Sequence, residues 1–142
     1  MEIVRSRKIL LDTNVFIGWL NDRRDEGFAI GRGFVRYLSA VVLMELRVGA
    51  GTARGRREID ALLRAYDARG RTVAPDRTMF DAAGDTLRRL KAEGREIRRS
   101  SLVSDVLIAH TARSLGAAVV TREADFKTIR AVLDFDLDLL AA

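Results

Sequence analysis

Acidic residues end or interrupt the apolar stretches of this 142-residue sequence at separate places: Asp12, Glu45, Asp105 and, after the last such stretch, either Glu123 or Asp125. Buried carboxylates are costly unless they are paired, hydrogen-bonded or bound to a metal. Gathered at one edge of a sheet, these acids would repel one another and raise some of their pKa values unless a divalent cation balanced the charge. Oxygen ligands without His or Cys favour Mg²⁺ or Mn²⁺ over Zn²⁺. The pattern therefore indicates a site for a hard cation.

Each acid also has a structural explanation. Asp12, together with Thr13, could cap the helix that follows. Asp105 could lie in the first turn of a helix, where the helix dipole favours an acid. Glu45 could extend to solvent, and Asp125 could cap a short helix. A metal site explains the acids as a set, whereas each of these alternatives explains a single acid.

The residues around Asp12 indicate how a fold would position it. The apolar run 9–11 leads into Asp12, and a second apolar run follows at 15–17. This is the pattern of a buried parallel strand that ends and continues as a helix. Asp12 would then lie at the carboxyl end of a strand, where open α/β sheets build their sites.

The rest of the chain alternates between strand and helix patterns. Strands are predicted at 8–12, 36–40, 72–74, 117–121 and 133–139. Helices are predicted at 14–20, 41–49, around 59–66, between Pro75 and Gly94, and at 102–115, with a short turn or helix at 123–129, a basic loop at 95–101 and no clear assignment for 21–33. We therefore expect residues 1–142 to form a single three-layer α/β/α domain with a mainly parallel sheet.

Composition limits the class of protein. The sequence has no Cys, no apolar run long enough to cross a bilayer and no apolar block near its start, so we expect a cytoplasmic protein rather than a membrane or secreted one. The net charge is +5, and all but three of the 25 basic residues are Arg, whose planar fork matches phosphate. This excess favours nucleic acid or acidic partners, although charged faces are often only solvated. The single histidine, His110, is expected to be a packed helix residue rather than a catalytic base.

Four segments follow one another over nearly the whole chain and carry these acids. They are Ile9 to Asn14, which ends in Asp-Thr-Asn; Val42 to Leu46, which contains Met-Glu-Leu; Asp105 to Ala109, Asp-Val-Leu-Ile-Ala; and Val119 to Phe126, Val-Val-Thr-Arg-Glu-Ala-Asp-Phe. In sequence and in order they resemble the signature blocks of PIN-domain ribonucleases, particularly the VapC-type toxins of bacterial and archaeal toxin–antitoxin pairs.

The resemblance implies a function, a cofactor and partners. The family's metal-binding acids fall on Asp12, Glu45 and Asp105, with Glu123 or Asp125 as the fourth acid. Its polar supporting positions fall on Asn14 and Thr121. The implied activity is that of a Mg²⁺- or Mn²⁺-dependent endoribonuclease, the toxin of a toxin–antitoxin pair. Carboxylate-held ions can activate a water, shield the phosphoryl oxygens and stabilise the leaving oxygen. The implied partners are an RNA substrate, a cognate antitoxin that covers the acidic pocket, and a second copy of the chain packed through helices.

Two other functions stay open from the sequence alone. A catalytically inactive PIN-like scaffold would bind RNA or protein without cutting it, which the ambiguous fourth acid allows. A different α/β phosphotransfer enzyme would use Asp12 as a nucleophile, but it would need a further acid just after Asp12, where Asn14 stands. For the nuclease, we expect Arg residues at 54–57 or 95–99 to bind the RNA backbone.

Overall fold

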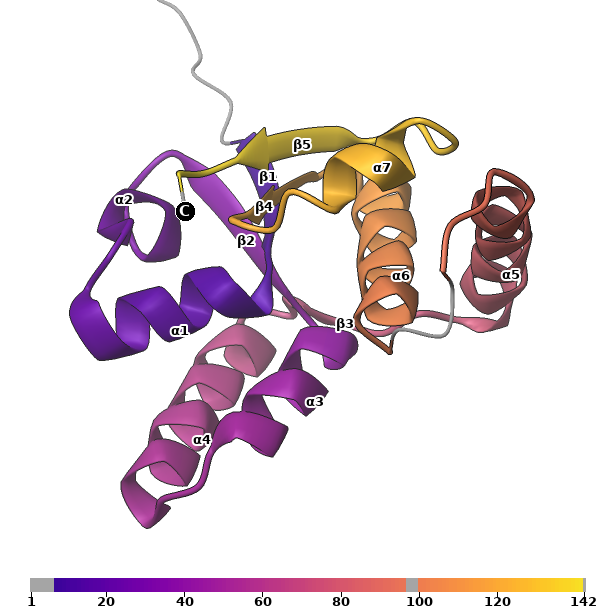
Figure 1. The fold of residues 1–142 in the computed structure, drawn as a ribbon. Helices are drawn as coiled ribbons and strands as arrows, with labels where there is room; N and C mark the ends of the chain where they lie inside the picture. The colour runs from indigo at the N-terminus through magenta and orange to yellow at the C-terminus, as the bar shows by residue number, and fades with distance from the viewer. Residues whose placement is uncertain (1–6, 97–99, 142) are drawn as a thin grey trace, which may run out of the picture.

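The computed structural model describes residues 7–96 and 100–141, and its centre is a sheet of five parallel strands (Figure 1). The strands lie in the order β3-β2-β1-β4-β5. Their bounds are β1 Arg7–Leu11, β2 Phe34–Ser39, β3 Thr72–Val73, β4 Ala118–Thr121 and β5 Asp136–Leu139. The expected parallel sheet is therefore confirmed.

Helices flank both faces of the sheet. Their bounds are α1 Thr13–Asp22, α2 Glu26–Ala29, α3 Ala40–Gly49, α4 Ala53–Ala68, α5 Arg77–Ala92, α6 Ser100–Leu115 and α7 Phe126–Arg130. Figure 1 shows α1, α2 and α4 on one side of the sheet and α5 and α6 on the other. The fold is thus the expected three-layer α/β/α arrangement. None of the described helices is long and apolar enough to span a membrane.

The two central strands bring the carboxyl ends of distant segments together. Residues 9–11 of β1 and all of β4 are buried on both faces, as apolar central strands of parallel sheets are. Their register pairs Leu10 with Val119 and Leu11 with Val120. The N–H of Asp12 donates to the carbonyl of Val120 at 2.9 Å, which extends the pairing by one residue. Asp12 and Thr121 consequently leave the same edge of the sheet.

Helix α6 lies in the core, which explains why its sequence is apolar on nearly every side. It contacts β1 and β4 as well as α5, α3 and α7. Val106, Ile108, Ala109 and Ala112 have no exposed surface. Asp105 lies among these buried positions, so the helix buries its one acid.

Several predicted boundaries differ from the structure by a few residues, among them those of α6, β5 and β2. The sequence predicts a basic loop at 95–101, yet α6 already begins at Ser100; residues 97–99 lie outside the described residues. β5 begins at Asp136 rather than 133, because the N–H of Leu133 still bonds to the carbonyl of Ile129 at the end of α7. β2 begins at Phe34, two residues earlier than predicted.

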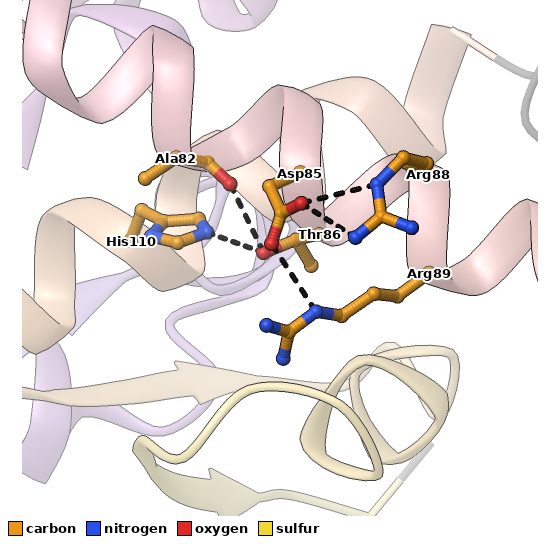
Figure 2. Close-up of polar contacts among 6 residues, drawn as sticks. All are labelled: Ala82, Asp85, Thr86, Arg88, Arg89 and His110. Atoms are coloured by element: carbon orange, nitrogen blue, oxygen red, sulfur yellow. Dashed lines mark hydrogen bonds and ion pairs between the residues drawn. The ribbon is translucent and has the colours of Figure 1, made fainter.

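His110 joins α6 to α5 through a buried hydrogen bond (Figure 2). Its Nε2 lies 2.7 Å from the hydroxyl of Thr86, and that hydroxyl donates to the carbonyl of Ala82 at 3.2 Å. The Nε2–H tautomer of His110 completes this chain of donors and acceptors. Asp85, next to Thr86, turns outward to Arg88 and Arg89. His110 is therefore a packed helix residue, as the sequence predicts.

We expect the stability that His110 confers to depend on pH. Burial, and secondarily the charge of Arg113, lower the pKa of His110 below its ordinary value. Because the unfolded chain takes up the proton first, this stability is present above pH ~6.5 and is lost as pH falls toward the lower folded pKa. The variant His110→Gln keeps a donor at the position of Nε2 but does not titrate. Urea unfolding at pH 7.5 and 5.5 should show the free energy of unfolding falling more in wild type than in the variant; equal changes would contradict the prediction.

Candidate active site

Thr121 is the centre of a hydrogen-bond network at the carboxyl edge of the sheet. Its hydroxyl donates to Oδ2 of Asp12 at 2.7 Å, from the neighbouring strand end. The same oxygen accepts from Nδ2 of Asn14 at 3.3 Å and from the N–H of Glu123 at 2.9 Å. One donor and two acceptor positions are the full capacity of a hydroxyl. The side chain of Thr121 is therefore held in one orientation, and it holds Asp12.

Asp12 combines a capping role with a place in the site. Its Oδ1 accepts from the N–H of Thr13 at 2.8 Å at the start of α1, and its Oδ2 also accepts from Nδ2 of Asn14 at 3.3 Å. The residue is 4% exposed. The helix cap and the site are thus compatible, because both need a carboxylate at this strand end.

Glu45 reaches the same region from α3, which follows the other neighbour of β1. The hydroxyl of Thr13 donates to its Oε1 at 3.0 Å, and the residue is half-buried. The alternative in which Glu45 simply extends to solvent does not hold. The first turn of α1 therefore contacts two of the predicted acids, with Thr13 on Glu45 and Asn14 on Asp12.

Asp105 is placed by α6. It is the sixth residue of that helix, because α6 begins at Ser100, so the reading of Asp105 as a first-turn residue is wrong. It is only 7% exposed. A carboxylate in the middle of a buried helix gains little from the terminal dipole, which acts within the first turn. Its burial needs another explanation.

The pKa values show that the acids influence one another. Burial and, after it, the charges of Asp12, Glu45, Glu123 and Asp125 together raise the pKa of Asp105 to about 8. Burial also raises the pKa of Asp12, against the hydrogen bonds from Thr121 and Thr13. The pKa of Glu45 is raised by burial and by Asp12, against the hydrogen bond from Thr13. All five acids that the sequence predicts therefore lie close enough for the charges of the other four to act on Asp105.

The turn after β4 keeps both candidates for the fourth acid near the others. Glu123 is exposed, and its Oε1 accepts from the N–H of Asp125 at 3.3 Å. Asp125 is half-buried and makes no side-chain capping bond to α7, so the cap alternative for Asp125 does not hold. Since both charges act on Asp105, neither residue is singled out.

The donor chemistry of this cluster suits a hard divalent cation. Within residues 7–96 and 100–141, no three acidic or imidazole side chains already stand close enough to hold a metal ion. The acids supply several carboxylate oxygens, which are the ligands that Mg²⁺ and Mn²⁺ prefer. They supply no nitrogen or sulfur ligand. No cation of the described residues is among the groups that shift the pKa values of Asp12, Glu45 and Asp105. A bound cation would relieve the repulsion that keeps these carboxylates apart.

Comparison with known families decides the identity of the fold. The family model of the PIN domain matches residues 9–132. The chain belongs to the PIN domain family. No curated protein sequence is significantly similar to this PIN domain.

Solved structures with the same fold include a member of a toxin–antitoxin system. VapBC-5 of Mycobacterium tuberculosis, a member of the VapBC family of toxin–antitoxin systems, is 27% identical with a TM-score of 0.63, over 95% of this chain and 98% of that one. FitAcB of Neisseria gonorrhoeae is 25% identical with a TM-score of 0.64, over 91% and 95%. VapBC2 of Rickettsia felis, solved with a DNA fragment from its promoter, has a TM-score of 0.70 over 94% and 98%, at 20% identity. The resemblance to VapC-type PIN proteins is confirmed.

Two residues of this PIN domain take part in the site without having been predicted. Thr13 orients Glu45, and the backbone N–H of Arg122 donates to Oδ1 of Asn14 at 3.0 Å. Each stands directly beside a predicted residue, Thr13 after Asp12 and Arg122 after Thr121. Their position beside a predicted site residue was therefore the only sequence signal of their role, because their contacts join segments that are far apart in the sequence.

We expect Asp105 to make the metal-free protein less stable as pH rises. Its folded pKa of about 8 lies above the unfolded value of 3.8, so between these values the unfolded chain releases a proton that the folded chain retains. Each pH unit within this window then costs up to about 1.4 kcal/mol of unfolding free energy. Urea unfolding in EDTA from pH 5 to pH 8 should show this decline reduced in Asp105→Asn. The control Asp85→Asn removes an exposed carboxylate whose pKa is lowered by Arg88, and it should keep the wild-type slope; equal slopes in all three proteins would refute the prediction.

Proposed function

We propose that this PIN domain is a divalent-metal-dependent endoribonuclease and the cytoplasmic toxin of a toxin–antitoxin pair. The observation that carries the proposal is the convergence of Asp12, Glu45 and Asp105 from β1, α3 and α6 at one edge of the sheet. Burying two acids and half-burying a third beside them is unfavourable for a structural purpose alone. Membership of the PIN family and the toxin–antitoxin neighbours support the same activity.

The side chains divide the work of such a site. Asp12, Glu45 and Asp105 would hold the principal Mg²⁺ or Mn²⁺, which supplies an activated water and balances charge on the phosphoryl oxygens. Glu123 or Asp125 would hold a second ion or orient the water. Thr121 and Asn14 keep Asp12 in place, because hydrogen bonds from such outer residues fix how a ligand points.

RNA binding is assigned to basic side chains on α4, the helix that follows the Glu45 helix and packs on it. Arg54, Arg56 and Arg57 lie in the first turns of α4, which packs on the helix that carries Glu45. Arg54 pairs with Glu58, while Arg56 and Arg57 are exposed. Of the segment 95–99, residues 97–99 lie outside the described part of the chain. Exposed guanidinium groups suit the phosphates of an RNA backbone.

The proposed partners are an antitoxin and a second copy of the chain. The neighbouring structures VapBC-5 and VapBC2 belong to toxin–antitoxin pairs, which supports an antitoxin partner here. A homodimer packed through helices is supported by large apolar side chains that helices expose. Met44 is 54% exposed and Val48 is 84% exposed, one turn apart on α3.

The purified chain should cleave RNA in a metal-dependent manner. We expect cutting of a pool of structured cellular RNAs, tRNA included, with Mg²⁺ or Mn²⁺, and none with EDTA. Asp12→Asn and Asp105→Asn should each lower the cleavage rate at least about a hundredfold, since even outer-shell changes cost ten- to a hundredfold. Circular dichroism checks that each variant is folded, and gel analysis of the products measures cleavage.

Two outcomes would overturn the proposal. Full activity of folded Asp105→Asn would remove Asp105 from the reaction. Binding of Mn²⁺ by titration calorimetry without cleavage of any RNA in the pool, in protein free of antitoxin, would favour a non-cutting scaffold that binds RNA or protein.

The homodimer leads to a separate expectation. In light scattering after size exclusion, wild type should have twice the mass of one chain. Met44→Ser with Val48→Ser should raise the dissociation constant of the dimer at least about tenfold, because burying each apolar side chain contributes more than 1.4 kcal/mol. Ile30→Ser is the control, because Ile30 is about as exposed as Met44 but follows α2 rather than lying on α3. A monomeric wild type would contradict the proposed dimer.

A further inference from the structure

The side chain of Arg122 joins three segments behind the acidic cluster. Its Nη1 donates to the backbone carbonyl of Asn14 at 2.9 Å, in the first turn of α1. Its Nη2 pairs with the carboxylate of Asp25, in the turn between α1 and α2. The side chain itself is 9% exposed, directly after the end of β4. A guanidinium held in this way is not free to bind RNA.

The backbone of Arg122 settles the orientation of the Asn14 amide. The N–H of Arg122 donates to Oδ1 of Asn14 at 3.0 Å, so the amide oxygen must face Arg122. The amide nitrogen then faces the acidic cluster, where Nδ2 donates to Asp12 and to Thr121. Arg122 therefore holds Asn14 in two ways: its side chain binds the backbone carbonyl of Asn14, and its backbone N–H binds the side-chain amide of Asn14.

Gly18 provides the space that the guanidinium occupies. A Cβ built on Gly18 would lie 2.9 Å from Nη1 of Arg122, closer than real contacts allow, and 3.3 Å from its Cζ, which is a tight contact. A glycine inside a helix costs about 1 kcal/mol relative to alanine, so its presence in α1 needs a reason. Gly18 lies one turn after Asn14, on the same face of the helix. The missing side chain lets Arg122 reach the Asn14 carbonyl.

Arg122 keeps these contacts although they leave one of its own donors without a hydrogen bond within the described part of the chain. Its Nε is buried and has no hydrogen-bond partner among the residues that the structure describes. A buried donor without a partner is unfavourable. Asp25, which receives the guanidinium, has a left-handed backbone with φ of 50°. Both features are expected where a side chain is retained for the position that it imposes on its neighbours.

We propose that Arg122 is a positioning residue, which fixes the first turn of α1 against the end of β4 so that the Asn14 amide holds Asp12 in the orientation that binds the metal. The inference rests on the proposed metal-dependent nuclease for its purpose. Its structural content, the orientation of Asn14, can be measured without metal or RNA.

The chain offers a direct probe, because it contains two Asn and no Gln. The side-chain amide signals of ¹⁵N-labelled protein therefore come from Asn14 and Asn21 alone, and Asn21→Asp identifies each pair. In metal-free protein, Arg122→Met should shift and broaden the Asn14 pair and leave the Asn21 pair in place. The control Arg88→Met removes an exposed, ion-paired guanidinium on α5 and should move neither pair. An unchanged Asn14 pair in folded Arg122→Met would overturn the proposal.

Metal binding tests the consequence for Asp12. The dissociation constant for Mn²⁺, measured by calorimetry, should rise about tenfold in Arg122→Met, the usual effect of losing an outer-shell contact. Gly18→Ala should raise it in the same direction, and it should add nothing in the Arg122→Met background because the displaced group is already absent. Equal Mn²⁺ affinity in wild type and Arg122→Met would overturn the inference and leave the nuclease intact.

Two further outcomes keep the two proposals separate. If wild type itself neither binds Mn²⁺ nor cuts RNA, the nuclease proposal fails while the amide signals still decide the orientation of Asn14. If Arg122→Met does not fold, Gly18→Ala and Asp25→Asn perturb the same guanidinium with Arg122 still present. An Asn14 pair that moves in those variants supports the proposal, and one that stays in place refutes it.

Discussion

The hydrogen bond from Thr121 to Asp12 is the interaction on which the rest of the site depends. It joins the ends of two strands that are adjacent in the sheet but more than 100 residues apart in the sequence. The hydroxyl of Thr121 also accepts hydrogen bonds from the side-chain amide of Asn14 and from the N–H of Glu123. One oxygen therefore links β4, α1 and the turn after β4 to the carboxylate of Asp12. The parallel register of β1 and β4 makes this contact possible, because it ends both strands at the same level.

Burial of like charges sets a second constraint, and the fold shows how it is met. The apolar strands and α6 contribute the hydrophobic stability that allows three acids with raised pKa values to persist together. Asp105 bears most of this cost, since it projects from a helix that is surrounded by other elements. Repulsion between carboxylates at the edge of a well-packed core is expected at a functional site. A purely structural core would place apolar residues at these positions.

The sequence was sufficient to predict the sheet, most helices and the five acids, because each depends on local pattern. The apolar run before Asp12 and the acid within the 102–109 run are visible without any tertiary knowledge. The start of α6 was missed because the charges before it conceal the helix, whose stability comes from packing. The contacts of Thr13 with Glu45 and of Arg122 with Asn14 depend on how α1 lies against α3 and β4, which no local pattern encodes.

The first turn of α1 then emerges as the common support of the site. Thr13 holds Glu45 and Asn14 holds Asp12, so two successive residues serve two acids that belong to different elements. Any displacement of this turn changes the separation of both carboxylates at once. The position of α1 is set in turn by what it packs against, and Gly18 lets that contact be a guanidinium rather than an apolar side chain. A polar, directional contact resists sliding of the helix more than apolar packing does, which suits a helix that must place two carboxylates relative to each other.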